Sequence, residues 1–377
     1  MRNSMNKLRL IVCAIIATVA LGALAGGMQA HAATSKKGME VHFIDVGQGD
    51  ATLIKSGGEA LLIDAGDNSV GTKVQLYLKK QGVTKLKAAI WTHPDADHIG
   101  GADVITTKYD IGTTYVSAAT SDTATYNDLT DAMEYKNITP TVPKVGDSFT
   151  VGDAKVTFVG PTKKYTDDNN SSLVCLVECA GNKFLFDGDA EAKSEAAIAK
   201  KWGKDIDADV LKVGHHGSSS STDRSFIKAV SPKYAVISCA EGNDYGHPHA
   251  ETLNTLRSNN VELRRTDEEG SIVATCDSNG ITWNCSPSTT WQAGEKQGTY
   301  KAEAEELAKQ QAEAEALAMQ QADNQAAQSD GTMVWLSATG EKYHSINNCG
   351  RMNPAKARQV TENEAIAQGY GKCSKCW

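Results

Sequence analysis

The stretch that decides the fold is "THPDADHIGG", residues 92–101, which directly follows the apolar run "LKAAIW", residues 86–91. The run predicts a buried strand that ends at Trp91, and Gly100 and Gly101 close the turn behind it. Two histidines and two aspartates fall between these points. Imidazole and carboxylate groups are the usual ligands of zinc, manganese and iron, so a turn at a strand end can direct them into one metal site. Taken alone, the stretch also fits a polar loop whose histidines are satisfied within the fold.

Three further stretches repeat this placement after an apolar run. "FDGDA" follows "KFLF", "GHHG" follows "LKV", and "YGHPHAET" comes after "YAVISC". In order, they contribute Asp187, Asp189, His215, His216, His247 and His249. The carboxyl ends of parallel strands share one edge of an α/β sheet, where their loops converge. Because six of the nine histidines lie in such strand-end motifs, the sequence predicts one metal-binding cleft.

The segment from Met39 to Trp291 is a mixed α/β pattern. Apolar runs of strand length recur along it, and helical periodicity separates some of them, at 70–82, 191–202 and 250–259. "DSNG" at 277–280 is typical of a hairpin turn. The segment is long enough for one large domain.

Seven motifs in this segment resemble the metallo-β-lactamase superfamily, and more narrowly the soluble hydrolase domain of ComEC-type competence proteins. They are "FIDVGQGDA" (43–51), "LLIDAG" (61–66), "THPDADHIGG" (92–101), "NNSSLV" (169–174), "FDGD" (186–189), "LKVGHHGSSSS" (211–221) and "YGHPHAETL" (245–253). The resemblance implies an αββα sandwich with a metal cleft at one edge. It also implies a divalent metal cofactor, two ions per site, manganese or zinc.

The resemblance also implies roles for individual residues. The family's metal-binding turn is His-x-His-x-Asp-His, and here Asp95 stands in place of its second histidine. Asn170 stands where the family has a middle histidine ligand, and Asp64 is expected to orient a ligand from behind. The oxygen ligands offered by Asp95 and Asn170 in place of histidine nitrogens favour manganese or magnesium over zinc. The full set of expected metal ligands is His93, Asp95, Asp97, His98, Asn170, Asp189, and His215 or His216 or both.

Other residues are expected to act around the metals. Asp97 would orient the attacking water, and His247 or His249 would protonate the leaving group or hold a phosphate oxygen. The alternative for the two histidines is capping of the helix that begins at "AETL". Residues 218–221 would donate hydrogen bonds to phosphate or form a flexible loop. Asp45 and Asp50, which flank "VGQG", are expected to bond backbone amides in a tight turn.

The implied activity is metal-assisted hydrolysis of a phosphodiester, and the expected substrate is extracellular DNA in a competence-related process. A phosphodiesterase of a cell-wall group such as teichoic-acid phosphocholine is the alternative enzyme. A catalytically inactive binding protein is the alternative of another class. The missing second histidine disfavours a β-lactamase. A formal charge of −8 argues against broad electrostatic binding of nucleic acid.

The amino-terminal residues 1–33 predict a secretory signal peptide. Basic residues precede an apolar stretch from Leu10 to Ala25, and the small-residue triplet 30–32 follows. An uncleaved membrane anchor is the alternative, which the shortness of the stretch disfavours. The sequence contains no membrane-channel segment of the competence type. The protein is therefore expected to be secreted or associated with the cell envelope.

The carboxyl-terminal part changes in composition. Residues 292–330 predict a helical or flexible linker rich in Ala, Glu and Gln, and residues 331–377 a small separate domain. This domain contains three cysteines and a histidine of the kind that bind structural zinc: His344, Cys349, Cys373 and Cys376. They predict a structural zinc site. A disulfide from Cys349 to Cys373 or Cys376 is the alternative. This domain is a candidate for attachment to the envelope or to a partner.

Overall fold

The computed structural model describes residues 38–294 and 332–377. The chain divides into two compact units, the first ending at residue 295 and the second starting at residue 296, and each is described by itself. The predicted signal peptide (1–33) and all but the first three residues of the predicted linker (292–330) lie outside the described residues.

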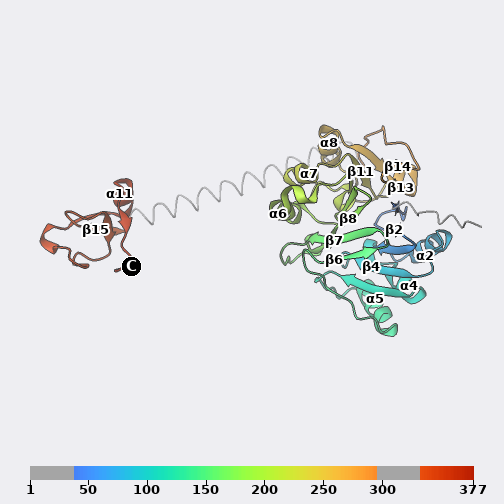
Figure 1. Cartoon of the computed structure of the whole chain (residues 1–377), viewed down its shortest axis with the longest axis horizontal. Helices are drawn as coiled ribbons and strands as arrows, with labels where there is room; N and C mark the ends of the chain where they lie inside the picture. The colour runs from blue at the N-terminus through green and yellow to red at the C-terminus, as the bar shows by residue number, and fades with distance from the viewer. Residues whose placement is uncertain (1–37, 295–331) are drawn as a thin grey trace, which may run out of the picture. The chain divides into compact units, whose positions relative to one another are not determined.

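The first unit contains two seven-stranded sheets that pack face to face (Figure 1). Sheet A has the order β14-β13-β1-β2-β3-β4-β5, and in it β3, β4 and β5 run parallel. Its strands are β1 (Gly38–Phe43), β2 (Thr52–Ser56), β3 (Glu59–Ile63), β4 (Leu86–Trp91), β5 (Ile111–Val116), β13 (Ile272–Asp277) and β14 (Gly280–Trp283).

Sheet B has the order β12-β11-β10-β9-β8-β7-β6, and in it β9 to β12 run parallel. Its strands are β6 (Ser148–Val151), β7 (Ala154–Gly160), β8 (Val174–Cys179), β9 (Asn182–Phe186), β10 (Val210–Lys212), β11 (Tyr234–Ile237) and β12 (Glu262–Arg265). Each sheet therefore has a parallel half whose strand ends can present loops to the same edge.

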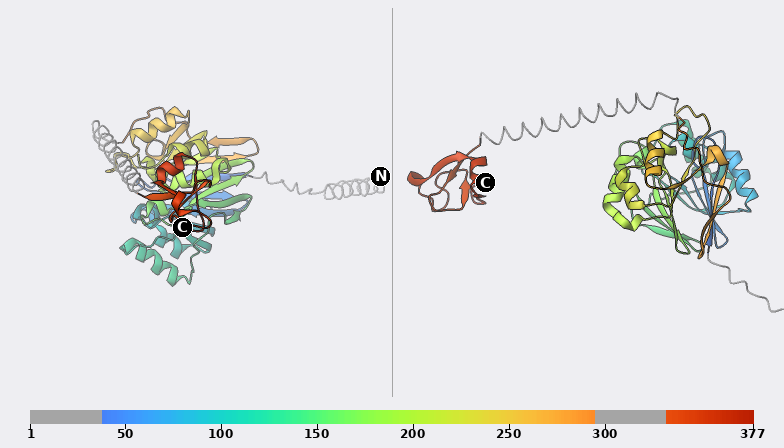
Figure 2. Two further views of the ribbon diagram at one scale, coloured as in Figure 1. Left: turned by 90° about the vertical axis from the view of Figure 1, so that its left-hand side faces the viewer. Right: turned by 90° about the horizontal axis from the view of Figure 1, so that it is seen from above.

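Helices cover the outer face of each sheet (Figures 1 and 2). On sheet A lie α2 (Gly71–Lys80), α4 (Ala102–Lys108) and α5 (Ala124–Tyr135), and on sheet B lie α6 (Ala192–Trp202), α7 (Arg224–Val230) and α8 (Ala250–Ser258). Short helical turns complete the unit: α3 (Ala96–Ile99), α9 (Thr266–Glu269), η1 (Asn169–Ser171), η2 (Gly203–Ile206) and η3 (Gly214–Gly217). Within the described ranges, none of the helices combines the length and apolar character needed to cross a membrane.

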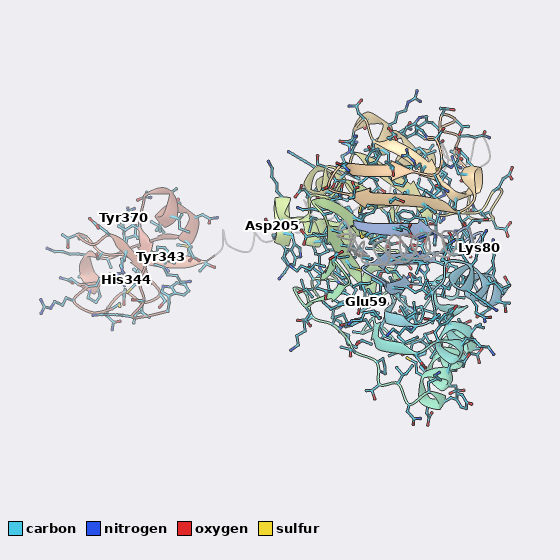
Figure 3. All side chains as sticks on the ribbon, turned by 45° about the vertical axis from the view of Figure 1, so that its right-hand side comes forward. Glu59, Lys80, Asp205, Tyr343, His344 and Tyr370 are labelled. Carbon is cyan, nitrogen blue, oxygen red and sulfur yellow. The ribbon has the colours of Figure 1, made fainter. Side chains whose placement is uncertain are left out.

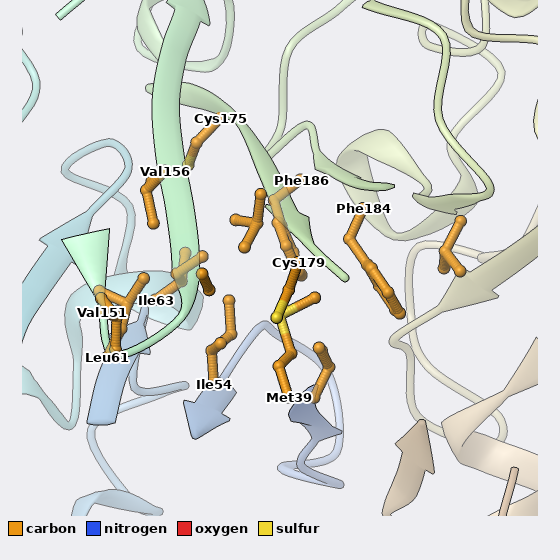
Figure 4. Packing of buried hydrophobic residues seen from close by; sticks show 14 of the residues in the cluster. Met39, Ile54, Leu61, Ile63, Val151, Val156, Cys175, Cys179, Phe184 and Phe186 are labelled. Carbon is orange, nitrogen blue, oxygen red and sulfur yellow. The ribbon is translucent and has the colours of Figure 1, made fainter. Parts of the chain in front are cut away.

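The space between the sheets is filled by apolar side chains from both inner faces. Ile54, Leu61 and Ile63 of sheet A meet Val156 and Phe186 of sheet B in this interior (Figure 4). Strands that are covered on both faces have little need of polar alternation, which is why the sequence shows them as near-continuous apolar runs.

The predicted αββα fold class is confirmed. The helical patterns at 70–82, 191–202 and 250–259 form α2, α6 and α8, and "DSNG" joins β13 to β14 with Asp277 opposite Gly280. This architecture places the ends of β4, β9, β10 and β11 at one edge of the sandwich.

The second unit is a four-stranded sheet with the order β17-β15-β16-β18. Its elements are β15 (Met333–Leu336), β16 (Lys342–His344), η4 (Pro354–Lys356), β17 (Arg358–Thr361), α11 (Glu362–Ala367) and β18 (Gly371–Lys372). A capping box starts α11, in which Thr361 and Glu364 each accept a backbone N–H of the other. The buried apolar cluster has only five residues, Val334, Leu336, Tyr343, Val360 and Ala365, which is a small core for an independent unit.

Candidate metal centre

The predicted motifs meet where β4, β9, β10 and β11 end. After β4, Asp95 has extended backbone angles and precedes α3, which carries Asp97 and His98. After β10, η3 carries His215 and His216, both with left-handed backbone angles (φ 49° and 53°). Residues other than glycine rarely adopt this conformation, and when they do the surrounding structure must hold them there, often at a functional site.

His98 is fully buried, and Asp64 fixes its ring from behind. Nδ1 of His98 lies 2.8 Å from Oδ2 of Asp64, which also accepts the hydroxyl of Thr92 at 2.7 Å, while Oδ1 accepts the Thr92 N–H at 2.8 Å. Because an ionised carboxylate can only accept, Nδ1 of His98 donates and its Nε2 carries a lone pair. That lone pair faces Oδ1 of Asp189 at 3.0 Å.

His216 is oriented in the same way. Its Nδ1 lies 3.0 Å from the backbone oxygen of Ser238 and 3.4 Å from Oδ1 of Asp50. Both of these atoms are acceptors, so Nδ1 donates and the Nε2 lone pair points inward. There it lies 3.1 Å from Oδ2 of Asp97 and 3.4 Å from Oδ2 of Asp189.

His93 and His215 complete a ring of four imidazoles around Asp189. Nδ1 of His93 lies 3.1 Å from the Thr92 hydroxyl oxygen, and its Nε2 lies 3.5 Å from Asp95 and 4.0 Å from Asp189. Nδ1 of His215 lies 3.1 Å from the Ser220 hydroxyl oxygen, and its Nε2 lies 3.8 Å from Asp189. Both members of the His215–His216 pair therefore direct Nε2 toward the same carboxylate.

The inner atoms of this cluster are acceptors that face acceptors. Nε2 of His98 and Nε2 of His216 are 3.2 Å apart, and one ligand atom each from Asp50, His98, Asp189 and His216 lies within 4.8 Å of the others. Nε2 of His93 and Oδ1 of Asp189 are buried without a hydrogen-bond partner. Such an arrangement needs positive charge at its centre.

Protons are one source of that charge. Burial alone would lower the pKa of His98 and of His216, but the Asp189 carboxylate raises both well above the ordinary range. Burial alone would raise the pKa of Asp189, but the charges of His216 and His98 hold it well below the ordinary range. A divalent cation is the other source, and the donor set of imidazole nitrogens and carboxylate oxygens fits one.

Asp50 lies behind His216, a position that the sequence did not predict. Its Oδ2 is 2.8 Å from Nζ of Lys212, and its Oδ1 faces the His216 ring. Burial would raise the pKa of Asp50, but Lys212 and His216 lower it to about 2. The expected bond to a backbone amide is found instead at Asp45, which accepts the N–H of Gly47 at 3.0 Å. A lysine inside the apolar run before the histidine pair was the available signal for this ion pair.

We expect Lys212→Met to destabilise the first unit by about 3–5 kcal/mol, because it would leave Asp50 buried and uncompensated. Lys212 is 2% exposed. Urea unfolding followed by tryptophan fluorescence measures the change. The double variant Lys212→Met/Asp50→Asn also removes the unpaired carboxylate charge and should recover much of the lost free energy of unfolding. A single variant as stable as the parent would contradict this account of the ion pair.

Asn170, a predicted metal ligand, forms hydrogen bonds within the fold through both atoms of its side-chain amide. Its Oδ1 accepts the backbone N–H of Ser194 at 3.0 Å. Its Nδ2 donates to Asp167 at 2.7 Å and to Glu191 at 3.1 Å. The amide is therefore committed to bracing the loop before β8 against the start of α6.

His247 lies over the histidine pair, with its ring centre 5.4 Å from that of His215 and 6.1 Å from that of His216. Burial, and then the charges of His216 and other neighbouring histidines, lower its pKa to about 3. The ring is therefore neutral at neutral pH, where it has one N–H to donate and no full positive charge.

His249, for which a catalytic role is predicted, forms hydrogen bonds to neighbouring loops through both ring nitrogens. Its Nδ1 accepts the N–H of Ser219 at 2.9 Å, and its Nε2 lies 3.1 Å from the backbone oxygen of Tyr245. Both ring nitrogens are thus used, although the residue is also the N-cap of α8 without a side-chain cap bond. In the serine run, Ser221 donates to the Ala190 oxygen at 2.8 Å, which orders this loop around the histidine pair.

The second unit contains a separate cysteine and histidine cluster. One ligand atom each from His344, Cys349, Cys373 and Cys376 lies within 4.8 Å of the others, and Figure 3 labels His344 beside Tyr343. The Sγ atoms of Cys349 and Cys373 are 3.8 Å apart, and Sγ of Cys376 is 3.6 Å from Nδ1 of His344. Bonds of about 2.3 Å to sulfur and 2.0–2.1 Å to nitrogen place such atoms about 3.8 and 3.5 Å apart in a tetrahedral zinc site. A disulfide would need the sulfurs about 2.05 Å apart.

Known structures of similar fold include the metallo-beta-lactamase fold protein YhfI from Bacillus subtilis. It has 14% sequence identity and a TM-score of 0.42, and the match covers 66% of this chain and all of that one. The diiron beta-hydroxylase CmlA from Streptomyces venezuelae has 13% identity and a TM-score of 0.42, with coverage of 65% and 55%.

Residues 44–241 match the family model described as the metallo-beta-lactamase superfamily. ComE operon protein 3 of Bacillus subtilis is 32% identical over 62% of this chain and 32% of its own length. Competence protein ComA of Neisseria gonorrhoeae is 30% identical over 60% of this chain and 31% of its own length. Recombination protein 2 of Haemophilus influenzae is 32% identical over 63% of this chain and 29% of its own length. The chain therefore spans less than one third of the length of each of these relatives.

Proposed function

The chain belongs to the metallo-β-lactamase superfamily of metal-dependent hydrolases, and from that membership we propose that it is a phosphodiesterase that cleaves DNA. The observation that carries the proposal is Asp189, whose oxygens face the Nε2 atoms of four histidines. A carboxylate in that position can be shared by two metal ions. Two-metal sites support in-line displacement at phosphorus in nucleases and phosphatases.

We assign the candidate ligands to two groups that share Asp189. His93, Asp95 and His215 would hold one ion, and Asp97, His98 and His216 would hold the other, with Asp189 common to both. His215 then takes the place that Asn170 was expected to fill. Three of the seven side chains are carboxylates, which supports hard, oxygen-preferring metals.

When bound, the metals would polarise a phosphoryl oxygen and lower the pKa of water so that hydroxide is available at neutral pH. Asp97 is the inner carboxylate positioned to meet the attacking water, because its side chain is 31% exposed whereas that of Asp189 is 3% exposed. Its Oδ2 can accept a hydrogen bond from that water and orient it toward phosphorus. His247, neutral and directly above, can donate its N–H to a phosphoryl oxygen.

The choice of DNA rests on the names of the relatives. One is named a competence protein, one a ComE operon protein and one a recombination protein, and we transfer the substrate that these names suggest. We further propose that residues 1–33 direct export, so that the substrate is extracellular DNA. Mass spectrometry of protein recovered from the medium tests export, since removal of the signal peptide 1–33 leaves a mature chain that begins after residue 33.

One experiment separates the candidate activities. Metal-loaded protein is incubated with bis-p-nitrophenyl phosphate, with labelled single- and double-stranded DNA, and with phosphocholine-bearing teichoic acid. Hydrolysis of the model diester and of DNA supports the proposal. Release of choline phosphate without DNA cleavage would replace it with the wall substrate. Metal binding without hydrolysis of any of these would indicate an inactive binding protein.

We expect manganese to restore more activity to chelated protein than zinc does. The carboxylates of Asp95, Asp97 and Asp189 give the site harder ligands than an all-histidine set, and harder ligands favour manganese. Hydrolysis of bis-p-nitrophenyl phosphate is measured at equal free concentrations of each metal after chelator removal. Rescue by zinc that equals or exceeds rescue by manganese would contradict the prediction.

A further inference from the structure

A pocket of about 420 Å³ lies directly beside the candidate metal centre. Its inner wall includes Ser171 and Leu173, on either side of Ser172. The Ser172 hydroxyl accepts the backbone N–H of Asp189 at 3.1 Å, and the N–H of Leu173 donates to the backbone oxygen of Thr92 at 2.9 Å. The segment 171–173 therefore both lines the pocket and contacts the loops that carry Asp189 and Thr92.

The remaining walls come from three loops, those that follow β5 and β7 and the one that precedes β6. They supply apolar side chains at Val142, Pro143 and Pro161. Val142 is 53% exposed, so an apolar surface is open to a ligand. Tyr165 forms another wall, and its hydroxyl donates to the backbone oxygen of Lys193 at 3.1 Å, which fixes the position of the ring.

Three exposed lysines, Lys144, Lys163 and Lys164, line the same pocket, and among its described lining residues there is no Asp or Glu. Elsewhere in the described part of the chain, six lysines form ion pairs with carboxylates (Lys55, Lys73, Lys87, Lys136, Lys183 and Lys212), and others, Lys79, Lys80 and Lys108 among them, form none. Lys144, Lys163 and Lys164 form none of the ion pairs found in that part. Lys163 instead places Nζ 5.1 Å from the centre of the Tyr165 ring.

This concentration of unpaired positive charge matters because the chain as a whole carries a formal charge of −8. A polyanion would be repelled by most of such a surface and attracted here. The pocket volume lies within the range of about 300–1,000 Å³ that small-ligand sites occupy. An apolar and aromatic wall with a cationic rim is the combination that binds unpaired nucleotides, because bases stack while lysines neutralise phosphates.

We propose that this lysine pocket, formed by residues 117–119, 142–145, 161–165, 171 and 173, binds one unpaired nucleotide next to the scissile phosphodiester. The inference rests on the proposed function and deepens it, because it specifies single-stranded DNA as the substrate. The base lies against Tyr165 and the apolar wall, and the flanking phosphates lie against the three lysines. A base in a duplex stays stacked on its neighbours and does not enter.

The test compares Lys144→Ala/Lys163→Ala/Lys164→Ala with a control that has the same loss of charge, Lys79→Ala/Lys80→Ala/Lys108→Ala. The control lysines are exposed on α2 and α4. KM for a single-stranded 12-nucleotide DNA is measured between 50 and 200 mM salt. In the pocket variant we expect KM to rise roughly tenfold or more, with kcat and hydrolysis of bis-p-nitrophenyl phosphate unchanged. The slope of log KM against log salt should fall by about 2, since each phosphate contact on a single strand contributes about 0.7.

A second variant separates the base from the phosphates. Ala118 is an exposed residue of the pocket lining, and Ala118→Trp should fill the space while keeping all three lysines. KM for the 12-nucleotide DNA should rise roughly tenfold through loss of base stacking, and the salt slope should stay at the parent value. An unchanged KM in this variant would overturn the nucleotide pocket, even if the lysine variant weakens binding.

The remaining outcomes are distinguishable. If the parent cleaves DNA and the lysine variant has the same KM and salt slope as its control, the pocket inference is overturned and the proposed function stands. Cleavage of duplex DNA as efficient as cleavage of the single strand, with the same dependence on the three lysines, also overturns it. If the parent hydrolyses bis-p-nitrophenyl phosphate but cleaves no DNA, the proposed function itself is overturned.

Discussion

Asp189→Asn is expected to reduce kcat/KM for bis-p-nitrophenyl phosphate to background and to reduce the metal bound by the first unit. Asp189 is the one carboxylate that faces the Nε2 atoms of His93, His98, His215 and His216. Asparagine keeps its size but removes the negative charge that both ions would share. The loss should exceed the roughly 10–100-fold that removal of a hydrogen-bond partner behind a metal ligand costs. Steady-state kinetics and elemental analysis of the purified protein measure the two effects.

Asp187→Asn is the matched control, since it makes the same substitution two residues earlier. Burial, and then the neighbouring Glu195 carboxyl, raise the pKa of Asp187 well above its ordinary range. Within the described residues, Asp187 forms none of the ion pairs to histidine that Asp189 forms, so asparagine, which has the same shape, should leave the histidine cluster in place. Activity and metal content should stay near the parent values. An equal loss in both variants would mean that Asp189→Asn acts by disturbing the turn after β9.

Much of the fold can be predicted from the sequence because most strands are buried on both faces. Runs such as Leu86–Trp91 and Asn182–Phe186 lie between a helix layer and the opposite sheet, so apolar residues continue without alternation. Three outer strands of the first unit lack such a run: β5 ends sheet A, and β6 and β12 end sheet B. β5 and β6 are partly exposed, and β12 carries the charged residues of "ELRR" although three of its four residues are buried.

Candidate metal ligands can be proposed from the sequence because their spacing is local, whereas the residues that orient them cannot. His93 to His98 occupy one turn, and their types alone indicate a metal site. The ion pair between Asp50 and Lys212 joins residues 162 positions apart, across the two sheets. The lysine stands out in its apolar run, but nothing local in the sequence identifies Asp50 as its partner. The three hydrogen bonds of the Asn170 amide, to Asp167, Glu191 and Ser194, are likewise not visible in the sequence, and its ligand role stays a prediction.

Cys373→Ser is expected to unfold the second unit. Its apolar core has five buried residues, and a core of that size cannot offset the conformational entropy of residues 332–377. Structural zinc contributes about 10–16 kcal/mol in small modules, which is more than such a core can supply. Three thiolates and one imidazole, at the separations found for His344, Cys349, Cys373 and Cys376, suit tetrahedral zinc. Losing one thiolate opens the tetrahedron and removes most of this stabilisation.

The measurement uses the full chain, so that the first unit serves as an internal reference. In Cys373→Ser, native mass spectrometry should show one zinc fewer, and trypsin should cleave rapidly within residues 332–377. Hydrolysis of bis-p-nitrophenyl phosphate should be unchanged, because every predicted ligand of that site lies in the first unit. Cys285→Ser, at a half-buried cysteine of the first unit, controls for the change of residue type and should leave zinc content intact. A parent chain whose carboxyl-terminal peptides carry no zinc and are two mass units light would contradict the zinc site. That result would establish a disulfide from Cys349 to Cys373 or Cys376, and His344 would then have no ligand role.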